Sequence, residues 1–135
     1  MIDIENDVFT AVATELRKRY KNIKVYGDEG TLVLATFPAV SMVETDNTTY
    51  LKSLTCDLAE NHAELLYSVN IYSNKEIGKK AECKSIMATV DEMMMRFGFT
   101  RTFCSKVPNL QDGKIYRITA RFHGVVGKDK KIYRS

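Results

Sequence analysis

The segment SNKEIGKKAECKSIMATVDEMMMRFG, residues 73–98, decides the fold because it is the longest stretch with clear helical periodicity. Ser73 and Glu76 have the spacing of a capping box, which predicts that the helix begins at Ser73. Gly98 can adopt the left-handed conformation that ends a helix. Met95 falls outside the apolar stripe and is the methionine to test for exposure. The stripe itself consists of residues three and four apart: Ile77, Ala81, Ile86, Met87, Val90, Met93, Met94 and Phe97.

A second helix is predicted near the N-terminus, from an Asp3 cap to about Tyr20. Its apolar residues follow one another in steps of four, and its last turn is basic, as the helix dipole prefers. The residues that make this apolar stripe are Ile4, Val8, Val12 and Leu16, with Ala11 alongside.

Alternating apolar and polar residues predict strands before and after the central helix. The strongest pattern runs from His62 to Tyr72, and Pro38 belongs at the start or on an edge of its strand because it cannot donate to a ladder. Residues 45–61 are rich in Thr, Asp and Asn and predict a long loop or hairpin arm. Further strands are expected at 23–25, 37–44, 99–103 and 115–123, and residues 132–133 form a short last strand or belong to a C-terminal tail at about 128–135.

These elements predict one α+β domain over residues 1–135. The chain has 135 residues, 44% of them apolar, which is enough for one core. No helix separates most neighbouring strands, so the sheet should be antiparallel or mixed with both helices on one face.

Charge is distributed unevenly along the chain. Residues 1–67 hold 6 Lys and Arg against 11 Asp and Glu, a net charge of −5, whereas residues 68–135 hold 14 against 6, a net charge of +8. Such halves can steer one copy onto the next, or the basic half can face a polyanion. No segment approaches the ~20 apolar residues of a membrane span, and the acidic N-terminus is unlike a signal peptide, so we expect no membrane association.

Candidates for chemistry are weak. Glu60, His62 and Glu64 would share one strand face and suit a metal or acid–base site, but alternating polar positions are more often a solvated strand face. Asp91 and Glu92 are neighbours on a helix and do not face one another. The three cysteines (Cys56, Cys83 and Cys104) are scattered and indicate ordinary thiols in a reducing cytoplasm. We expect no catalytic residue, cofactor or metal, and therefore no enzyme.

Interface candidates are clearer. Arg117, Arg121 and His123 share one face of the last long strand, where they suit either a subunit interface with the acidic half or a nucleic-acid backbone. Tyr116 and Phe122 alternate to the opposite face, so this row should lack the aromatic platform of single-strand binders. The apolar residues of the arm, which could reach a neighbouring copy, are Tyr50, Leu51 and Leu54.

The sequence resembles small proteins from the morphogenesis clusters of phages and prophages of Gram-positive bacteria, and its element order resembles the tail terminators (tail-completion proteins) of long-tailed phages. The resemblance implies two helices on an antiparallel sheet and a six-copy ring that caps the tail tube, contacts tail-tube and neck or connector proteins, and lets DNA pass without sequence-specific binding. It implies assembly in the bacterial cytoplasm and a final place in the virion tail or neck. Head–tail adaptors are of similar size and stay an alternative, as does a nucleic-acid-binding module. The resembling stretches, which cover well over half of the chain, are FPAVSMVETDN (37–47), ENHAELLYSVNIYSNKEIGKKAECKSIMATVDEMM (60–94), GFTRT (98–102) and IYRITARFHGVV (115–126).

Overall fold

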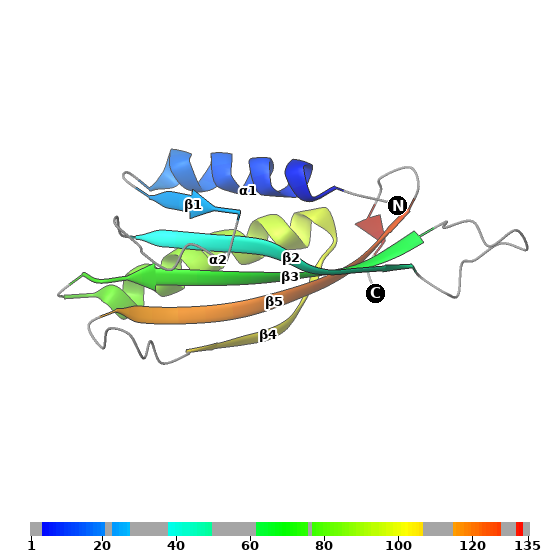
Figure 1. Cartoon of the computed structure of the whole chain (residues 1–135). Helices are drawn as coiled ribbons and strands as arrows, with labels where there is room; N and C mark the ends of the chain where they lie inside the picture. Colours follow the sequence, from blue (N-terminus) through cyan, green and yellow to red (C-terminus); the bar gives the residue numbers. More distant parts are fainter. Residues whose placement is uncertain are drawn as a thin grey trace, which may run out of the picture.

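The part of the chain that the structure describes folds into one sheet with two helices (Figure 1). The computed structural model describes residues 4–20, 23–27, 38–49, 62–75, 77–106, 115–127 and 132–133. The predicted order of helix, strands, helix and strands is confirmed. The elements are α1 (Glu5–Arg19), β1 (Lys24–Tyr26), β2 (Ala39–Thr49), β3 (His62–Ser73), α2 (Lys79–Phe97), β4 (Thr100–Lys106), β5 (Tyr116–Gly127) and β6 (Ile132–Tyr133).

The sheet is mixed, with strand order β1-β2-β3-β5-β4 among the described residues. β1 pairs with β2 in parallel, and the β2–β3, β3–β5 and β4–β5 pairs are antiparallel. The two-residue β6 pairs with β5 beyond the part that β4 covers, so residues 132–133 are a short strand. Among the described strands, β4 lies at one edge of the sheet, and β1 lies at the other, where it covers only Ala39 to Ser41 of β2.

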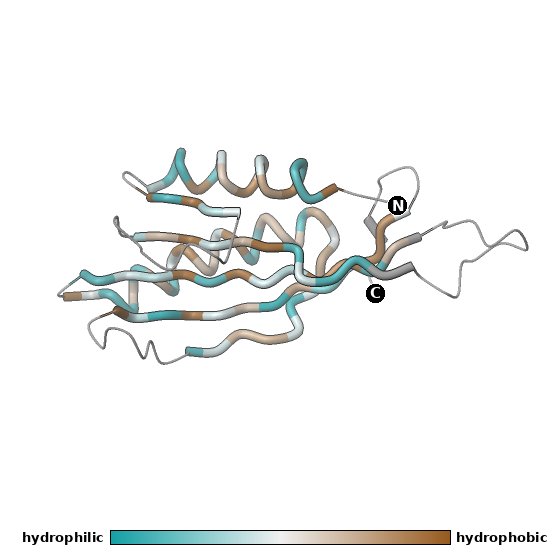
Figure 2. The backbone as a smooth tube through the Cα atoms, in the orientation of Figure 1, coloured by the Kyte–Doolittle hydropathy of each residue, from teal (hydrophilic) through white to brown (hydrophobic). Residues whose placement is uncertain are grey.

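Both helices pack on the same face of the sheet, as predicted. Alternate residues of β3, such as Leu65 and Val69, share one buried apolar cluster with Val12 of α1 and Val90 of α2. The Tyr20 hydroxyl at the end of α1 lies 2.7 Å from the Ser85 hydroxyl and 3.2 Å from that of Thr89, both on α2. Figure 2 shows the alternation of hydropathy along the strands that makes this one-sided packing possible.

The beginning of α2 differs from the prediction. The helix starts at Lys79, and Gly78 occupies the N-cap with a left-handed φ of 87° and no side-chain cap. Ser73 instead ends β3, where its hydroxyl donates a 2.7 Å hydrogen bond to the Glu82 carboxylate. Ile77 consequently lies outside the helix and is 86% exposed, and Ala81 is also exposed, so neither belongs to the core.

The end of α2 confirms the prediction. Gly98 has a φ of 98°, and its N–H donates to the Met95 carbonyl. The N–H of Phe99 donates to the Met94 carbonyl. This pair of hydrogen bonds is a Schellman motif. Of the three consecutive methionines near the end of α2, Met94 is buried, Met93 packs against the core and Met95 is 45% exposed.

The predicted α1 is present, but Ile4 occupies its N-cap without a side-chain cap, and the predicted cap Asp3 lies outside the described residues. In the first turn of the helix, the Glu5 carboxylate accepts a 3.2 Å hydrogen bond from the backbone N–H of Glu44 on β2.

The predicted arm begins later than residue 45. Residues up to Thr49 continue β2 and pair with β3, with a register shift between Glu44 and Asp46. The Thr45 hydroxyl, at the shift, donates to the Leu66 carbonyl at 3.1 Å. Polar composition concealed this part of the strand, because Thr45 and Asp46 at the bulge are exposed and interrupt the apolar alternation. Pro38, as predicted, directly precedes β2.

Candidate subunit interface

The sheet has an open face, opposite the helices, on which Arg117, Arg121 and His123 of β5 lie as predicted. Their alternation partners on β5, including Ile118 and Phe122, are buried on the helix face. Along this row Arg121 is exposed, whereas Arg117 and His123 are half-buried. The three residues thus share a face but differ in how far they are available to a partner.

Arg117 is held by neighbours on its own chain. Its Nε and Nη2 donate to Asn70 Oδ1 on β3 at 3.1 and 2.8 Å, and the Thr119 hydroxyl donates to the same oxygen at 2.7 Å. The guanidinium also lies 5.5 Å from the ring centroid of Tyr72. Asn70 is only 3% exposed, so these contacts form a cross-strand network rather than a free cationic surface.

Arg121 is the more available cation, and its main contact is aromatic. Its guanidinium lies 5.3 Å from the ring centroid of Phe103 on β4, and Phe103 itself is 41% exposed. The row itself carries no aromatic side chain, as predicted, but the neighbouring strands bring two rings beside it. Tyr116 and Phe122 do point away from it, but the adjacent strands supply Tyr72 and Phe103 at the positions paired with Arg117 and Arg121.

The acidic and histidine candidates form no compact site in the described part of the chain. His123 Nε2 lies 3.7 Å from Glu64 Oε2, and Glu60 is outside the described residues. Asp91 pairs with Arg101 at 3.2 Å, and Glu92 pairs with Arg96. Within the described ranges, no group of three or more His, Cys, Asp or Glu side chains is arranged to hold a metal ion.

The other predicted interface residues, Tyr50, Leu51 and Leu54, lie outside the described residues. The described structure places the ends of their segment at Thr49 and His62, where β2 and β3 extend beyond the helices (Figure 1).

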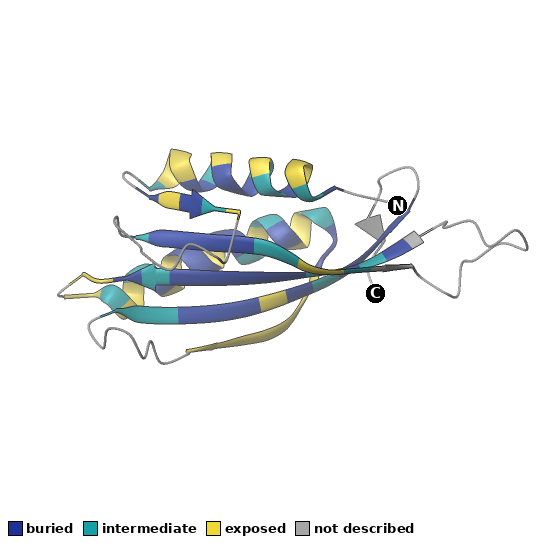
Figure 3. Cartoon of the chain, viewed as in Figure 1, coloured by how far each residue is buried: buried dark blue, intermediate teal, exposed yellow. Residues whose placement is uncertain are grey.

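The β4 edge is an interface candidate that the sequence did not indicate. All seven residues of β4 are exposed (Figure 3), and among the described strands β5 alone pairs with it. Its outward backbone groups are therefore available to a further strand. A register shift between Arg101 and Phe103 disturbs one end, and the stretch from Phe103 to Lys106 is regular. The position of a strand at an edge depends on sheet order, which periodicity does not report.

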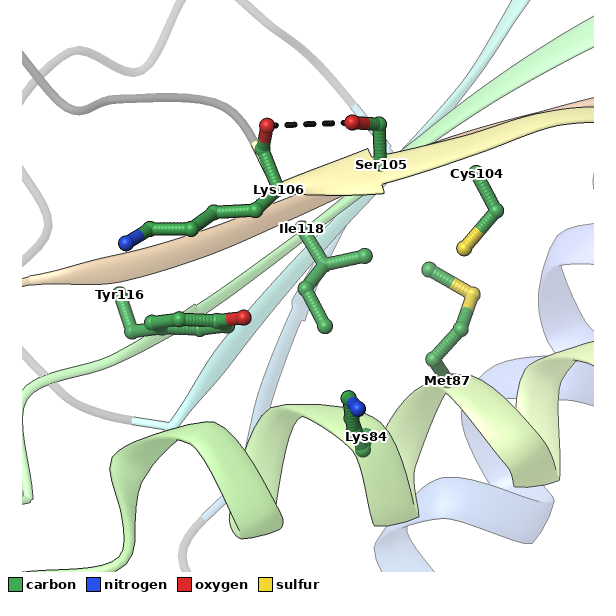
Figure 4. A pocket seen from close by; sticks show the side chains of 7 residues that line it. All are labelled: Lys84, Met87, Cys104, Ser105, Lys106, Tyr116 and Ile118. Atoms are coloured by element: carbon green, nitrogen blue, oxygen red, sulfur yellow. Dashed lines mark hydrogen bonds between the residues drawn. The ribbon is translucent and has the colours of Figure 1, made fainter.

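A pocket of about 210 Å³ adjoins this edge on the helix face. In Figure 4 the side chains of Met87 and Ile118 line its interior, and the Lys106 chain extends over the Tyr116 ring. Lys106 Nζ lies 5.2 Å from the centroid of that ring. The remaining lining residues come from α2 and β4: Lys84, Cys104 and Ser105.

The uneven charge of the sequence becomes a difference between the two edges of the molecule. α2, β4 and β5, at the β4 edge, hold eight Lys and Arg against three Asp and Glu, a net charge of +5. α1, β1 and β2, at the other edge, hold four against five, a net charge of −1. The pocket and the exposed strand thus lie on the basic side.

A scan against protein-family models and a search of curated proteins found no significant match to this chain. Neither α1 nor α2 is long and apolar enough to cross a membrane, within the described residues. The structure defines the class as an α+β protein with one mixed sheet and an exposed basic edge. Its function is therefore argued from these surfaces.

Proposed function

We propose that this protein is a tail terminator, a structural subunit of a long-tailed phage or phage-tail-like particle. Copies join into a closed ring of six at the end of the tail tube. The ring stops polymerisation, contacts the neck or connector proteins and lets DNA pass without reading its sequence. It assembles in the host cytoplasm and stays in the tail or neck region of the particle.

The observation that carries this proposal is the exposed β4 edge beside an open apolar pocket. Long exposed edges invite pairing with another chain, and isolated proteins usually cover or disrupt them. Here Arg101, Lys106 and the register shift give partial protection against indiscriminate pairing. A specific neighbouring copy that covers both would pair with the exposed strand and fill the apolar pocket.

The two edges differ in chemistry, which favours a heterologous contact between unlike surfaces. A heterologous contact forms a ring when its rotation closes, and it forms a filament when it does not. The basic β4 edge and the less basic opposite edge give such a contact a direction. The sequence resemblance to tail terminators selects the closed form.

Sedimentation and electron microscopy test the proposal. We expect a discrete ring-sized species in solution, and rings at one end of purified tail tubes that stop further tube growth. A protein that remains monomeric at high concentration and leaves tube growth unchanged would contradict it. Binding to the head connector with no affinity for tubes would instead place the ring in the adjacent neck layer, as a head–tail adaptor.

A nucleic-acid-binding module is a second candidate, favoured by the aromatic neighbours of the arginine row. Tyr72 and Phe103 lie beside Arg117 and Arg121 on the open face, and aromatic rings with cations on a sheet suit a single strand. Both rings are already in contact with guanidinium groups, which leaves less surface for bases. Titration with oligo(dT) at several salt concentrations tests this function, and absence of binding at low ionic strength would exclude it.

A further inference from the structure

The β4 edge and the pocket beside it form one continuous surface. β4 contributes Cys104, Ser105 and Lys106 to the pocket lining, and the same residues belong to its regular, exposed stretch. An extended segment that added to this edge would therefore carry alternate side chains past the mouth of the pocket. This is the geometry of strand addition, in which backbone hydrogen bonds give affinity and a pocket selects one side chain.

The segment between β2 and β3 begins and ends far from this surface. β5 shows the separation, because Gly127 pairs with His62 at the end of β3 while Ile118 lines the pocket. The nine residue steps from Ile118 to Gly127 along the strand span about 30 Å. Residues 50–61 have both ends fixed at Thr49 and His62, so this twelve-residue segment extends at most about 20 Å from them. A chain's own segment therefore falls short of the pocket on the same chain.

The chemistry of residues 50–61 complements the pocket. The segment YLKSLTCDLAEN offers Tyr50, Leu51 and Leu54 as apolar side chains, and it carries two acidic residues against one lysine. The pocket has an apolar interior with Lys84 and Lys106 among its lining residues. An apolar side chain with a nearby carboxylate suits such a lining better than a purely apolar or basic segment does.

We propose that residues 50–61 of one copy occupy the pocket and the β4 edge of the next copy. The inference rests on the proposed ring, and it specifies which surfaces meet in it. Thr49 and His62, which flank the donor segment, lie far along the sheet from the acceptor pocket, so each copy would donate its segment at one end and bind a segment at the other. This head-to-tail contact is heterologous and can close into a ring.

Native cysteines allow a direct test, because Cys104 lines the pocket and Cys56 lies in the donor segment. Mild oxidation of the assembled protein should produce a ladder of dimers, trimers and larger species on a non-reducing gel. Mass spectrometry should identify a Cys56–Cys104 disulfide between copies. Cys56→Ser or Cys104→Ser should remove every band above the dimer, because a disulfide between like positions joins only two chains.

Moving the donor cysteine along the segment tests which of its positions lies beside Cys104. In a Cys56→Ser background, Leu51→Cys and Leu54→Cys each provide another point of contact with Cys104. A ladder from any of the three donor positions supports the proposal. Assembled protein that gives no ladder from all three, or only a fast-migrating intramolecular disulfide, overturns it while the ring stands. Protein that is monomeric by sedimentation overturns the ring as well.

Charge reversal gives a second measurement. Lys84→Glu should raise the concentration for half-assembly by roughly fivefold or more, because it places a carboxylate where the acidic segment binds. Lys80→Glu is the matched control, since Lys80 is exposed on the same helix but does not line the pocket. Equal effects of the two variants would show that net charge, and not the pocket, governs assembly. If Cys104 becomes shielded from a thiol reagent only after tail tubes are added, the pocket binds a tail-tube protein and not the segment of another copy.

Discussion

At the scale of single residues, Gly124 lies beneath the ring of Phe99. A Cβ added at Gly124 would stand 2.6 Å from Phe99 Cδ1 and 2.8 Å from Cε1, well inside van der Waals contact. The ring is 1% exposed and meets Tyr67 edge-on, with centroids 5.2 Å apart. The residue that follows α2 therefore packs against β5 only because position 124 has no side chain.

We expect Gly124→Ala to lower the free energy of unfolding by about 1–3 kcal/mol, since Phe99 must leave a well-packed position. Urea unfolding measures the change. Gly27→Ala is the control, because its added Cβ would lie 3.5 Å from Phe9 Cε2, an ordinary contact. Similar losses in both variants would mean that the approach of Phe99 is not what requires glycine at position 124.

Two described cysteines should differ sharply in reactivity. Cys83 is fully buried, its thiol faces the carbonyls of Ile71 and Tyr116, and Cys104 is exposed. Burial, with a smaller contribution from the Glu82 charge, raises the pKa of Cys83 from 9.0 to about 12. At pH 8 a thiol reagent should therefore modify Cys104 in the native protein and reach Cys83 only on unfolding.

The raised pKa of Cys83 also makes the stability of the folded protein depend on pH. Between pH 9 and about 12 the unfolded state loses the Cys83 proton while the folded state keeps it, so this contribution to stability is complete below pH 9 and declines above it.

Peptide mapping after labelling, with Cys104→Ser for comparison, measures the reactivity of the two thiols. Rapid native modification of Cys83 would show that its environment is open to solvent.

At the scale of elements, the pairing of β3 with β5 is reinforced by polar contacts on the open face. Asn70 Oδ1 accepts three hydrogen bonds, two from Arg117 and one from Thr119. A single buried acceptor thus joins the two strands through their side chains as well as their backbones. Arg117, named from the sequence as an interface residue, belongs structurally to this network.

Asn70→Ala should cost about 1–3 kcal/mol, because it leaves a guanidinium and a hydroxyl without their shared acceptor. Asn70→Asp should cost less, since it keeps the acceptor and adds a charge opposite Arg117. Thermal melts of both variants at neutral pH test this order. An equal loss would assign the cost to packing at position 70.

At the scale of the whole molecule, the sheet order separates a basic edge from a less basic one and exposes β4 on the basic side. The open face borders that edge through Arg121 and Phe103, and the pocket borders it from the helix side. Surfaces on both sides of one strand are therefore in position to meet a neighbouring copy.

We expect Arg121→Glu to weaken assembly with little change in the melting temperature, because Arg121 is exposed and its aromatic contact is worth about 0.5–1 kcal/mol. Arg117→Glu should lower the melting temperature itself. Lys18→Glu, an equal charge change on the exposed side of α1, is the control for assembly. Sedimentation and melts on the same samples separate the effects, and an Arg121→Glu variant that only unfolds would remove this residue from the interface.

Side-chain periodicity alone was sufficient to predict most of the helices and strands. The stripe of Val8, Val12 and Leu16 and the alternation of Leu65 and Val69 both match buried faces in the structure. Some boundaries were predicted wrongly: a Ser-x-x-Glu pattern indicated a helix start at Ser73, but pairing with β5 keeps Ser73 in β3. Thr45 to Thr49 likewise belong to β2 through pairing with β3, despite their polar composition.

The sequence by itself determined the helices, most strands, the one-sided α+β architecture and the face shared by Arg117, Arg121 and His123, because side-chain periods of 3.6 and 2 are local properties. Only the tertiary structure decided that Tyr72 and Phe103 stand beside the arginines and that β4 is an exposed edge with a pocket. Those features depend on strand order and register. Both are set by contacts between residues far apart in the chain, which no local pattern records.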